Sequence, residues 1–352
     1  MIYLDNAATT RVNNFVYLEA EPYFRDEYGN PSSLHKVGTK AKEAIETARK
    51  QVADSINAKP EQIFFFSSAT EANNFVLNNY YSGCSPYEHS SVFKNAQDKH
   101  PSLYSHMLVN NETGDIFDIK ELCRIAHDNE VDFHTDATQA FGKMIIDVKD
   151  LDVDYLTFSG HKIHGMKGCA VLYIKVPEIC RNRKKMMLGG DQEKGFHPGT
   201  ENVPAIVAMG RACKIFNYRN LDEIVKIQME DLNHSCIEKF IASGIDFALN
   251  GISDKQVPSI LNISFKDIDG ETLQYMLSRK GVCVSTSSAC SSGKKKSRVL
   301  EAMNVPDDYI YGAIRISFSY DELKYWYSVY YNKVMKAIDI IISTVEELKA
   351  YG

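Results

Sequence analysis

Apolar segments of strand length alternate with segments of helix length from about residue 34 to residue 215. This order is typical of α/β domains, in which helices cover a mostly parallel sheet. The helix-like segments are 39–57 and 119–129, and the strand-like segments are 62–67, 104–109, 131–135, 154–159 and 169–174. We therefore predict a large α/β domain at residues 12–221.

The order of segments changes after about residue 221. There the chain shows a helix at 221–243, a strand at 259–265, a helix at 270–280 and a long final helix. Ser319 and Glu322 have the capping-box spacing that opens this last helix. We predict a second, smaller α+β domain, formed by residues 1–11 together with 222–352.

The composition excludes several classes of protein. With 352 residues, of which 44% are hydrophobic, the chain is long enough to bury a large core. Its formal net charge of -6 offers no broad positive surface, so we predict no direct binding to nucleic acid. Aliphatic runs such as Ile340-Ile341-Ile342 are far shorter than the ~20 apolar residues of a membrane-spanning helix. We expect a cytoplasmic protein that does not enter a membrane.

The eight cysteines are scattered and form no C-x-x-C pair. This usage argues against zinc ribbons and disulfide frameworks, and it favours a reducing compartment. His161 and His164, with Cys169 nearby, do not have the spacing of a zinc site. We predict no metal site, and we expect all the cysteines but one to fill the core.

Two polar motifs follow predicted strands. Lys162 ends the motif Ser159-Gly160-His161-Lys162, and Asp136 opens the motif Asp136-Ala137-Thr138-Gln139. The carboxyl ends of strands are where α/β proteins bind ligands. A lysine and a carboxylate at such positions suit pyridoxal phosphate, because the amine forms a Schiff base with the aldehyde and the carboxylate pairs with the ring nitrogen. A predicted helix start at Ser68-Ala69-Thr70 offers hydroxyl groups to the phosphate.

A series of short motifs extends this pattern along the chain. They are Tyr-Leu-Asp-Asn-Ala-Ala-Thr-Thr at 3–10, Gly-Asn-Pro-Ser-Ser-x-His at 29–35, Ala-Thr-Glu-Ala-Asn-Asn at 69–74, Glu-His at 88–89, Asn-Asn-Glu-Thr-Gly at 110–114, Asp-Ala-Thr-Gln at 136–139, Ser-Gly-His-Lys at 159–162, Gly-Thr-Glu-Asn at 199–202, Ser-Ser-Ala-Cys-Ser at 287–291 and Ile-Arg-Ile-Ser at 314–317. In this order the motifs resemble those of the cysteine desulfurases of the NifS and IscS group, within the class V aminotransferase-like pyridoxal enzymes.

The resemblance implies a homodimer with fold type I of the pyridoxal phosphate-dependent transferases, in which the large domain binds the cofactor. It implies that Lys162 binds the cofactor covalently, that His89 stacks on its ring and that Asp136 pairs with the ring nitrogen. The further residues implied are Asn111 and Gln139 for the phenolic oxygen, Ala69, Thr70, Ser159 and His161 for the phosphate, Thr200 for the phosphate bound by the other subunit, and Asn30 and Arg315 for the substrate carboxylate.

Cys290 lies among small hydroxyl residues, a composition typical of an exposed loop. The basic run 294–296 and Arg298 follow, and nearby cations favour a thiolate, although the same charges suit an acidic partner protein. The resemblance implies that Cys290 takes the sulfur of L-cysteine as a persulfide, leaving L-alanine, with His89 as a proton donor or acceptor. The sulfur then passes to an acceptor, such as an iron-sulfur scaffold or a tRNA thiolation protein.

The chain departs from the resemblance in three places. Residues 90–109 are too few by roughly thirty, about one strand-helix-strand unit, so we expect an edge strand and its helix to be missing. Ser68 replaces a frequent glycine, and His197-Pro198 replaces Arg-Ser.

Two alternatives to a desulfurase stay open. One is another pyridoxal enzyme of this fold, either a selenocysteine or cysteine sulfinate lyase or an aminotransferase, for which Cys290 would be dispensable. The other is a non-catalytic scaffold that binds partners.

Overall fold

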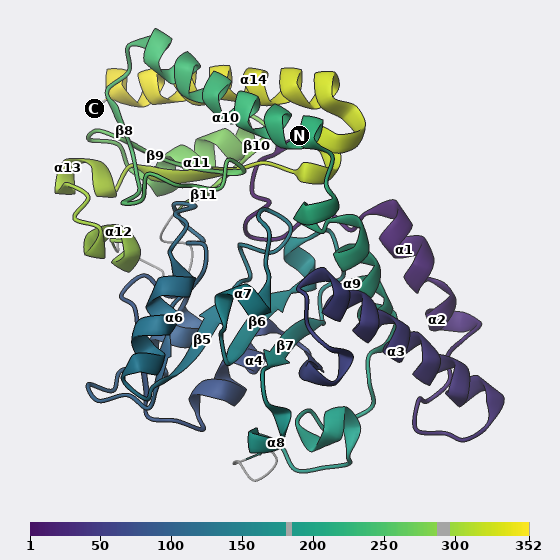
Figure 1. Ribbon diagram of the computed structural model, residues 1–352. Coiled ribbons are helices and arrows are strands. Elements are labelled where there is room, and N and C mark those ends of the chain that lie inside the picture. The colour runs from purple at the N-terminus through teal and green to yellow at the C-terminus, as the bar shows by residue number, and fades with distance from the viewer. Residues whose placement is uncertain (181–184, 287–295, 352) are drawn as a thin grey trace. The chain divides into compact units, whose positions relative to one another are not determined.

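The computed structural model describes residues 1–180, 185–286 and 296–351 (Figure 1). The chain divides into two compact units. The large unit consists of residues 11–109 and 117–220, and the small unit consists of residues 1–10, 110–116 and 221–352. Each unit has a sheet and a hydrophobic core of its own.

The sheet of the large unit has the strand order β2-β7-β6-β5-β4-β3. Its strands are β2 (Ile63–Phe66), β3 (Ser82–Cys84), β4 (Leu103–Ser105), β5 (Asp132–Asp136), β6 (Tyr155–Ser159) and β7 (Ala170–Ile174). Neighbours from β3 to β6 pair in parallel, whereas β7 runs antiparallel to both β2 and β6. The predicted α/β class with a mostly parallel sheet is therefore confirmed.

Helices surround this sheet in the large unit. They are α1 (Asn14–Ala20), α2 (Pro22–Arg25), α3 (Lys36–Ser55), α4 (Ala69–Leu77), α5 (Ser90–Phe93), α6 (Ile119–Asp128), α7 (Val148–Leu151), α8 (Pro177–Cys180) and α9 (Val203–Ile215). Helix α3 begins before the predicted residue 39 because the His35 ring accepts the N–H of Gly38 at 3.3 Å. Helices α3 and α9 pack closely, since a Cβ at Gly210 would lie 2.6 Å from the Cα of Ala48.

Residues 90–109 contain the short helix α5 and the strand β4, towards one side of the sheet. The strand predicted at 104–109 is shorter in the structure, where β4 spans Leu103–Ser105. Its neighbour β3, with the sequence Ser-Gly-Cys, was not predicted. The prediction failed there because Gly83 and two small side chains carry neither the β-branched nor the aromatic composition of strands.

The small unit contains an antiparallel sheet with the order β11-β12-β9-β8 and a parallel pair of β1 and β10. The strands are β1 (Ile2–Tyr3), β8 (Phe247–Leu249), β9 (Ile260–Phe265), β10 (Val282–Cys283), β11 (Ser285–Thr286) and β12 (Ala313–Ser317). The helices are α10 (Glu223–Ser243), α11 (Gly270–Arg279), α12 (Arg298–Ala302), α13 (Asp307–Ile310) and α14 (Tyr320–Tyr351).

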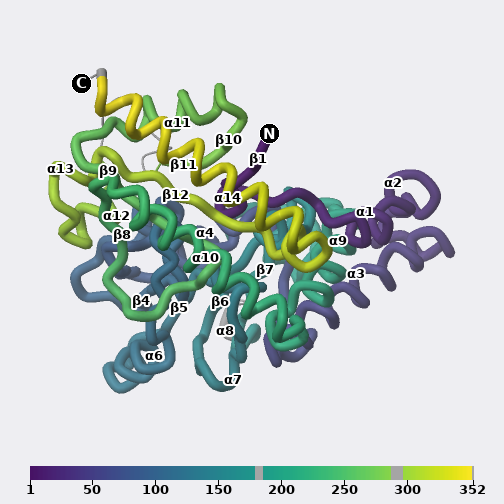
Figure 2. The backbone as a smooth tube through the Cα atoms, turned by 90° about the horizontal axis from the view of Figure 1, so that it is seen from above, coloured from purple at the N-terminus to yellow at the C-terminus, as the bar shows by residue number. Residues whose placement is uncertain are grey.

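Helices α10 and α14 pack on each other in the small unit (Figure 2). As predicted, Ser319 opens α14, because its Oγ accepts the N–H of Glu322 at 3.2 Å. The helix contains one irregular residue, Trp326, whose φ of -143° interrupts the helical geometry. Among the described residues, no helix is both long and apolar enough to cross a membrane.

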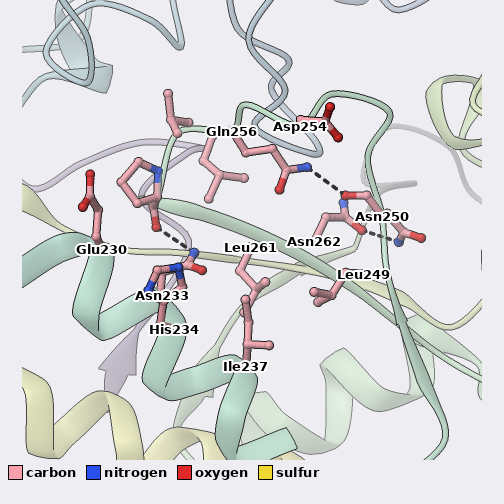
Figure 3. A pocket seen from close by; sticks show the side chains of 13 residues that line it. Glu230, Asn233, His234, Ile237, Leu249, Asn250, Asp254, Gln256, Leu261 and Asn262 are labelled. Carbon is pink, nitrogen blue, oxygen red and sulfur yellow. Dashed lines mark hydrogen bonds between the residues drawn. The ribbon is translucent and has the colours of Figure 1, made fainter. Parts of the chain in front are cut away.

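The small unit also has a pocket of about 330 Å³ beside α10, shown in Figure 3. Its polar lining consists of Glu230, Asn233, His234, Asn250, Asp254, Gln256 and Asn262. The amides of Asn250 and Asn262 are joined by a hydrogen bond of 2.7 Å. No residue of the predicted site lines this pocket.

Candidate active site

Lys162 lies in a tight turn at the carboxyl end of β6. The strand ends at Ser159, and residues 160–162 form one turn of 3-10 helix. The N–H of Gly165 donates to the carbonyl of Gly160 at 2.9 Å, and a Cβ at Gly165 would lie only 2.8 Å from that oxygen. The glycine thus permits the close turn that holds Lys162 at the end of the strand, half-buried.

Asp136 is the last residue of β5, and its carboxylate is held at both oxygens. Oδ1 accepts the N–H of Thr138 at 2.9 Å, and Oδ2 accepts Nδ2 of Asn73 at 2.9 Å. Strands β5 and β6 are parallel neighbours, with Asp136 level with Thr157. The carboxylate and the turn that carries Lys162 therefore lie at the same edge of the sheet, as the sequence predicted.

Helix α4 begins directly after β2, and its first turn is capped by side chains. Ser68 Oγ accepts the N–H of Glu71 at 3.2 Å, and Glu71 Oε2 accepts the N–H of Ser67 at 3.0 Å. The N–H groups of Ala69 and Thr70 lie in the first turn, where a helix offers no internal acceptor. The start of α4 thus has the geometry of an anion site, with the Ser68 hydroxyl engaged in the cap.

His197 contacts the same helix start. Its Nε2 lies 3.1 Å from Glu71 Oε1 and 3.3 Å from Ser67 Oγ, and its ring packs on Phe66 at 5.0 Å. The residue that departs from the family pattern therefore supports the cap of α4. Thr200, three residues further along, is exposed.

Three further predicted site residues of the large unit, His89, Gln139 and Asn30, differ in exposure and in hydrogen-bond partners. His89 is exposed at the start of α5, where its Nδ1 accepts the N–H of Ser91 at 3.2 Å. Gln139 is buried and accepts a hydrogen bond from Lys143. Asn30 is exposed, and its Oδ1 accepts the N–H of Ser32 at 2.9 Å, the turn geometry expected of an asparagine before proline.

Arg315 and Asn111 meet in the small unit. The Nη1 of Arg315 donates to the carbonyl of Asn111 at 2.6 Å, and its Nη2 pairs with Asp5 Oδ1 at 3.0 Å. Two polar atoms of this group are buried without a hydrogen-bond partner, namely Arg315 Nε and Asn111 Oδ1. A donor and an acceptor therefore remain for a ligand that carries both kinds of group.

Cys290 lies outside the residues that the structure describes. Of the cysteines inside them, burial raises the pKa of Cys123 and of Cys236 to about 12, and it raises the pKa of Cys169 and Cys213 as well. These four thiols stay protonated at neutral pH and cannot serve as nucleophiles. Lys296, at the end of the basic run, forms an ion pair with Asp307 at 2.8 Å.

Burial also changes the charge of two histidines near the site. It lowers the pKa of His161 to about 4, assisted by the charges of Lys162 and Lys167. It also lowers the pKa of His134, which is fully buried in β5, two residues before Asp136. Both rings are therefore neutral at neutral pH. His161 can offer a phosphate a hydrogen bond but no positive charge.

These two shifts predict how stability depends on pH. In the unfolded chain a histidine takes up its proton near pH 6.5, whereas these two stay neutral in the fold until the pH is much lower. The unfolded state then binds more protons, so we expect stability to fall as the pH drops from 6.5 towards 4. For each histidine that stays neutral, the loss at pH 5 is about 2 kcal/mol. Urea unfolding of the cofactor-free protein at pH 7.5 and at pH 5 measures this loss of unfolding free energy.

The matched variant for this test is His134→Asn. It lacks the buried titrating ring, so the difference in stability between pH 7.5 and pH 5 should shrink relative to the parent. An equal difference in the two proteins would show that His134 is protonated in the fold.

Comparison with known proteins identifies the family. The family model for aminotransferase class-V matches residues 2–92 and 87–324. The cysteine desulfurase IscS of Methanosarcina thermophila is 35% identical to this chain, and the match covers 90% of the chain and 86% of that protein. The chain belongs to the cysteine desulfurase family. The predicted resemblance is thereby confirmed.

Solved structures that resemble this chain support the same assignment. A NifS-like protein matches with a TM-score of 0.84 at 31% identity, and the match covers 100% of both chains. The structure described as SspA in complex with cysteine matches with a TM-score of 0.76 at 28% identity, covering 90% of this chain and 99% of that one. The predicted fold type I of the pyridoxal phosphate-dependent transferases is confirmed by these likenesses. The two matched pieces of the family model meet at residues 87–92, where the stretch predicted to be shortened begins.

Enzymes of the cysteine desulfurase family use pyridoxal phosphate, and the residues of the large unit fit this group. An amine follows β6, a carboxylate ends β5, and a helix start without internal acceptors follows β2. The hydroxyl oxygen of Thr138, next to this edge of the sheet, is buried without a hydrogen-bond partner. An aldehyde, a basic ring nitrogen and a phosphate thus each find a group of matching chemistry.

Sequence reasoning missed Asn73, Ser91 and Thr157, which hold the site residues. Asn73 Nδ2 contacts both Asp136 and Ser91, and Thr157 donates to Asn73 Oδ1 at 2.5 Å. One signal was available for Asn73. It lies one helical turn after Thr70, so a helix that presents Thr70 to a ligand places Asn73 on a neighbouring part of its surface.

Proposed function

We propose that this protein is a pyridoxal phosphate-dependent cysteine desulfurase that converts L-cysteine to L-alanine and takes the sulfur onto Cys290. The observation that carries the proposal is the common edge of β5 and β6, where Asp136 and the Lys162 turn lie together. Membership of the cysteine desulfurase family supports it, and no observation favours a lyase of another substrate, an aminotransferase or a scaffold.

The residues of the large unit hold the cofactor in this proposal. When bound, pyridoxal phosphate withdraws electrons from the α-carbon of the substrate. Lys162 anchors the cofactor covalently and, once released by the substrate, its amine removes the α-proton. Asp136 holds the proton of the ring nitrogen, and His89 packs on the ring. The other cofactor contacts proposed in the large unit are Gln139 at the phenolic oxygen, and Ala69, Thr70, Ser159 and His161 at the phosphate. Asn111, which belongs to the small unit, is proposed as a second contact to the phenolic oxygen.

The substrate carboxylate binds Arg315 and Asn30 in this proposal. The unpartnered Nε of Arg315 supports this assignment, since a guanidinium with a remaining donor suits a carboxylate. The Cys290 thiolate then attacks the substrate sulfur. A sulfur–sulfur bond forms and the carbon–sulfur bond breaks, with its electron pair remaining on the carbon side, which is later protonated to give alanine.

Further parts of the proposal concern assembly and sulfur transfer. We propose a homodimer in which Thr200 reaches the partner's phosphate site, supported by its exposure and by the exposed apolar side chains Tyr28, Leu34 and Leu188. The sulfur acceptor would be a protein of iron-sulfur assembly or tRNA thiolation. We assign the enzyme to the cytoplasm, supported by the free thiols of six cysteines, namely Cys84, Cys123, Cys169, Cys213, Cys236 and Cys283.

The direct test of this function is the fate of the sulfur atom. The purified protein, loaded with pyridoxal phosphate, is mixed with L-cysteine without reductant, and its peptides are analysed by mass spectrometry. We expect one added sulfur atom on the peptide that contains Cys290. Sulfide release with an unmodified Cys290 would show that the sulfur leaves by another route.

A further inference from the structure

A series of hydrogen bonds in the large unit links Asp136 to His89. Asn73, on α4, is 0% exposed, and its Nδ2 lies 2.9 Å from Asp136 Oδ2 and 3.0 Å from Ser91 Oγ. Ser91 Oγ lies 2.8 Å from His89 Nδ1, and Ser91 is itself buried. Asp136 and His89, which the proposed function places on the cofactor ring, are thus joined by two residues to which that proposal gives no contact with substrate or cofactor.

The orientation of Asn73 follows from its partners. The carboxylate of Asp136 can only accept, so the amide atom that faces it must be the NH2 group. The second hydrogen of this group is donated to Ser91 Oγ. On the other side, Thr157 donates its hydroxyl proton to Asn73 Oδ1 at 2.5 Å, which holds the amide in this orientation.

The proton position on His89 follows in turn. Ser91 Oγ accepts from Asn73, so its own proton is available for His89 Nδ1. The backbone N–H of Ser91 points at the same nitrogen, at 3.2 Å, and an N–H cannot accept a hydrogen bond. His89 Nδ1 therefore carries no proton, and the neutral ring carries its proton on Nε2.

The hydrogen bonds at the other end of the network, from Thr157 to Ser105, are consistent with these donor and acceptor assignments. Because Thr157 gives its proton to Asn73, it accepts from His134 Nε2 at 3.4 Å. His134 is neutral, so its Nδ1 lacks a proton and accepts from Ser105 Oγ at 2.8 Å. Each side-chain donor from Ser105 Oγ to Ser91 Oγ thus has an acceptor within the network.

On the basis of the proposed function, we propose that Asn73 and Ser91 are positioning residues that hold neutral His89 with its proton on Nε2 and connect it to Asp136. His89 then acts as a proton donor through Nε2, and it cannot accept a proton at that atom while neutral. Both residues act on the reaction only through His89 and Asp136.

The test reads the proton position directly by NMR. Protein labelled with 15N-histidine and loaded with pyridoxal phosphate is measured without substrate, and His89 is assigned as the signal lost in His89→Gln. We expect the Nε2–H form in the parent. Ser91→Ala removes the hydroxyl donor at 2.8 Å and leaves His89 Nδ1 only the longer contact to the backbone N–H at 3.2 Å. We therefore expect a mixture of the two ring forms and a kcat lower by ~10-fold with little change in KM.

Two variants serve as controls. Ser91→Thr retains a hydroxyl, so it should restore both the Nε2–H form and kcat, whereas Ser90→Ala removes a neighbouring exposed hydroxyl outside the network and should change neither. An Nδ1–H form in the parent, or an unchanged ring form in Ser91→Ala, would overturn the proposal. Since the spectra need no turnover, this result is independent of whether L-cysteine is the substrate.

Discussion

Replacing Lys162 by alanine is expected to remove the cofactor's covalent attachment and to reduce turnover by on the order of 1,000-fold. The amine lies in the turn after β6, at the edge of the sheet that also holds Asp136. Without the Lys162 amine, the cofactor is held only by noncovalent contacts to its ring and its phosphate. The variant also lacks the proposed base for the α-proton. Absorbance in the visible range before and after dialysis measures the attachment.

A matched control is Lys167→Ala, which removes an exposed lysine from the same loop. This variant should keep its visible absorbance and most of its turnover. If Lys162→Ala kept a covalently bound cofactor through dialysis and denaturation, another lysine would be the attachment site and the account of this edge of the sheet would be wrong.

Replacing Cys290 by alanine has the second large expected effect. The variant should lose sulfide production by at least ~100-fold while its visible spectrum stays that of the parent, because in the proposed function Cys290 takes the sulfur and does not hold the cofactor. Buried thiols cannot substitute for it, since their raised pKa keeps Cys123 and Cys236 protonated. Sulfide production from L-cysteine and the absorbance spectrum are measured on the same sample.

The control for this variant is Cys283→Ala. Cys283 lies in β10 and is half-buried, so its loss tests whether any accessible thiol supports the reaction. We expect Cys283→Ala to retain turnover. Equal turnover in Cys290→Ala and the parent would instead favour a lyase that releases sulfur without a protein thiol.

The positions of Lys162 and Asp136 could be predicted because strong apolar strands precede them. Strands β5 and β6 are buried over most of their lengths, and such runs can be recognised without knowledge of their partners. The start of α4 was predictable for a similar reason, since Ser68 is a capping residue next to an apolar strand. In each case the signal lies within a few residues of the site residue.

The supporting network could not be predicted in the same way. Asn73 binds Asp136 and Thr157, which are far from it in the sequence, and only the pairing of the strands brings them together. Strand β3 was missed because its small residues lack a strand-like composition, although it pairs with β4 over its full length. Contacts that depend on tertiary packing leave little trace in local sequence.

The stoichiometry of products from L-cysteine tests the central claim most directly. The protein loaded with pyridoxal phosphate is incubated with L-cysteine and dithiothreitol, and sulfide and alanine are both quantified, with Cys290→Ala measured in parallel. We predict equal amounts of the two products from the parent, and neither above background from the variant. A protein that binds the cofactor yet forms neither product, or forms both without Cys290, would contradict the assignment as a cysteine desulfurase acting through this thiol.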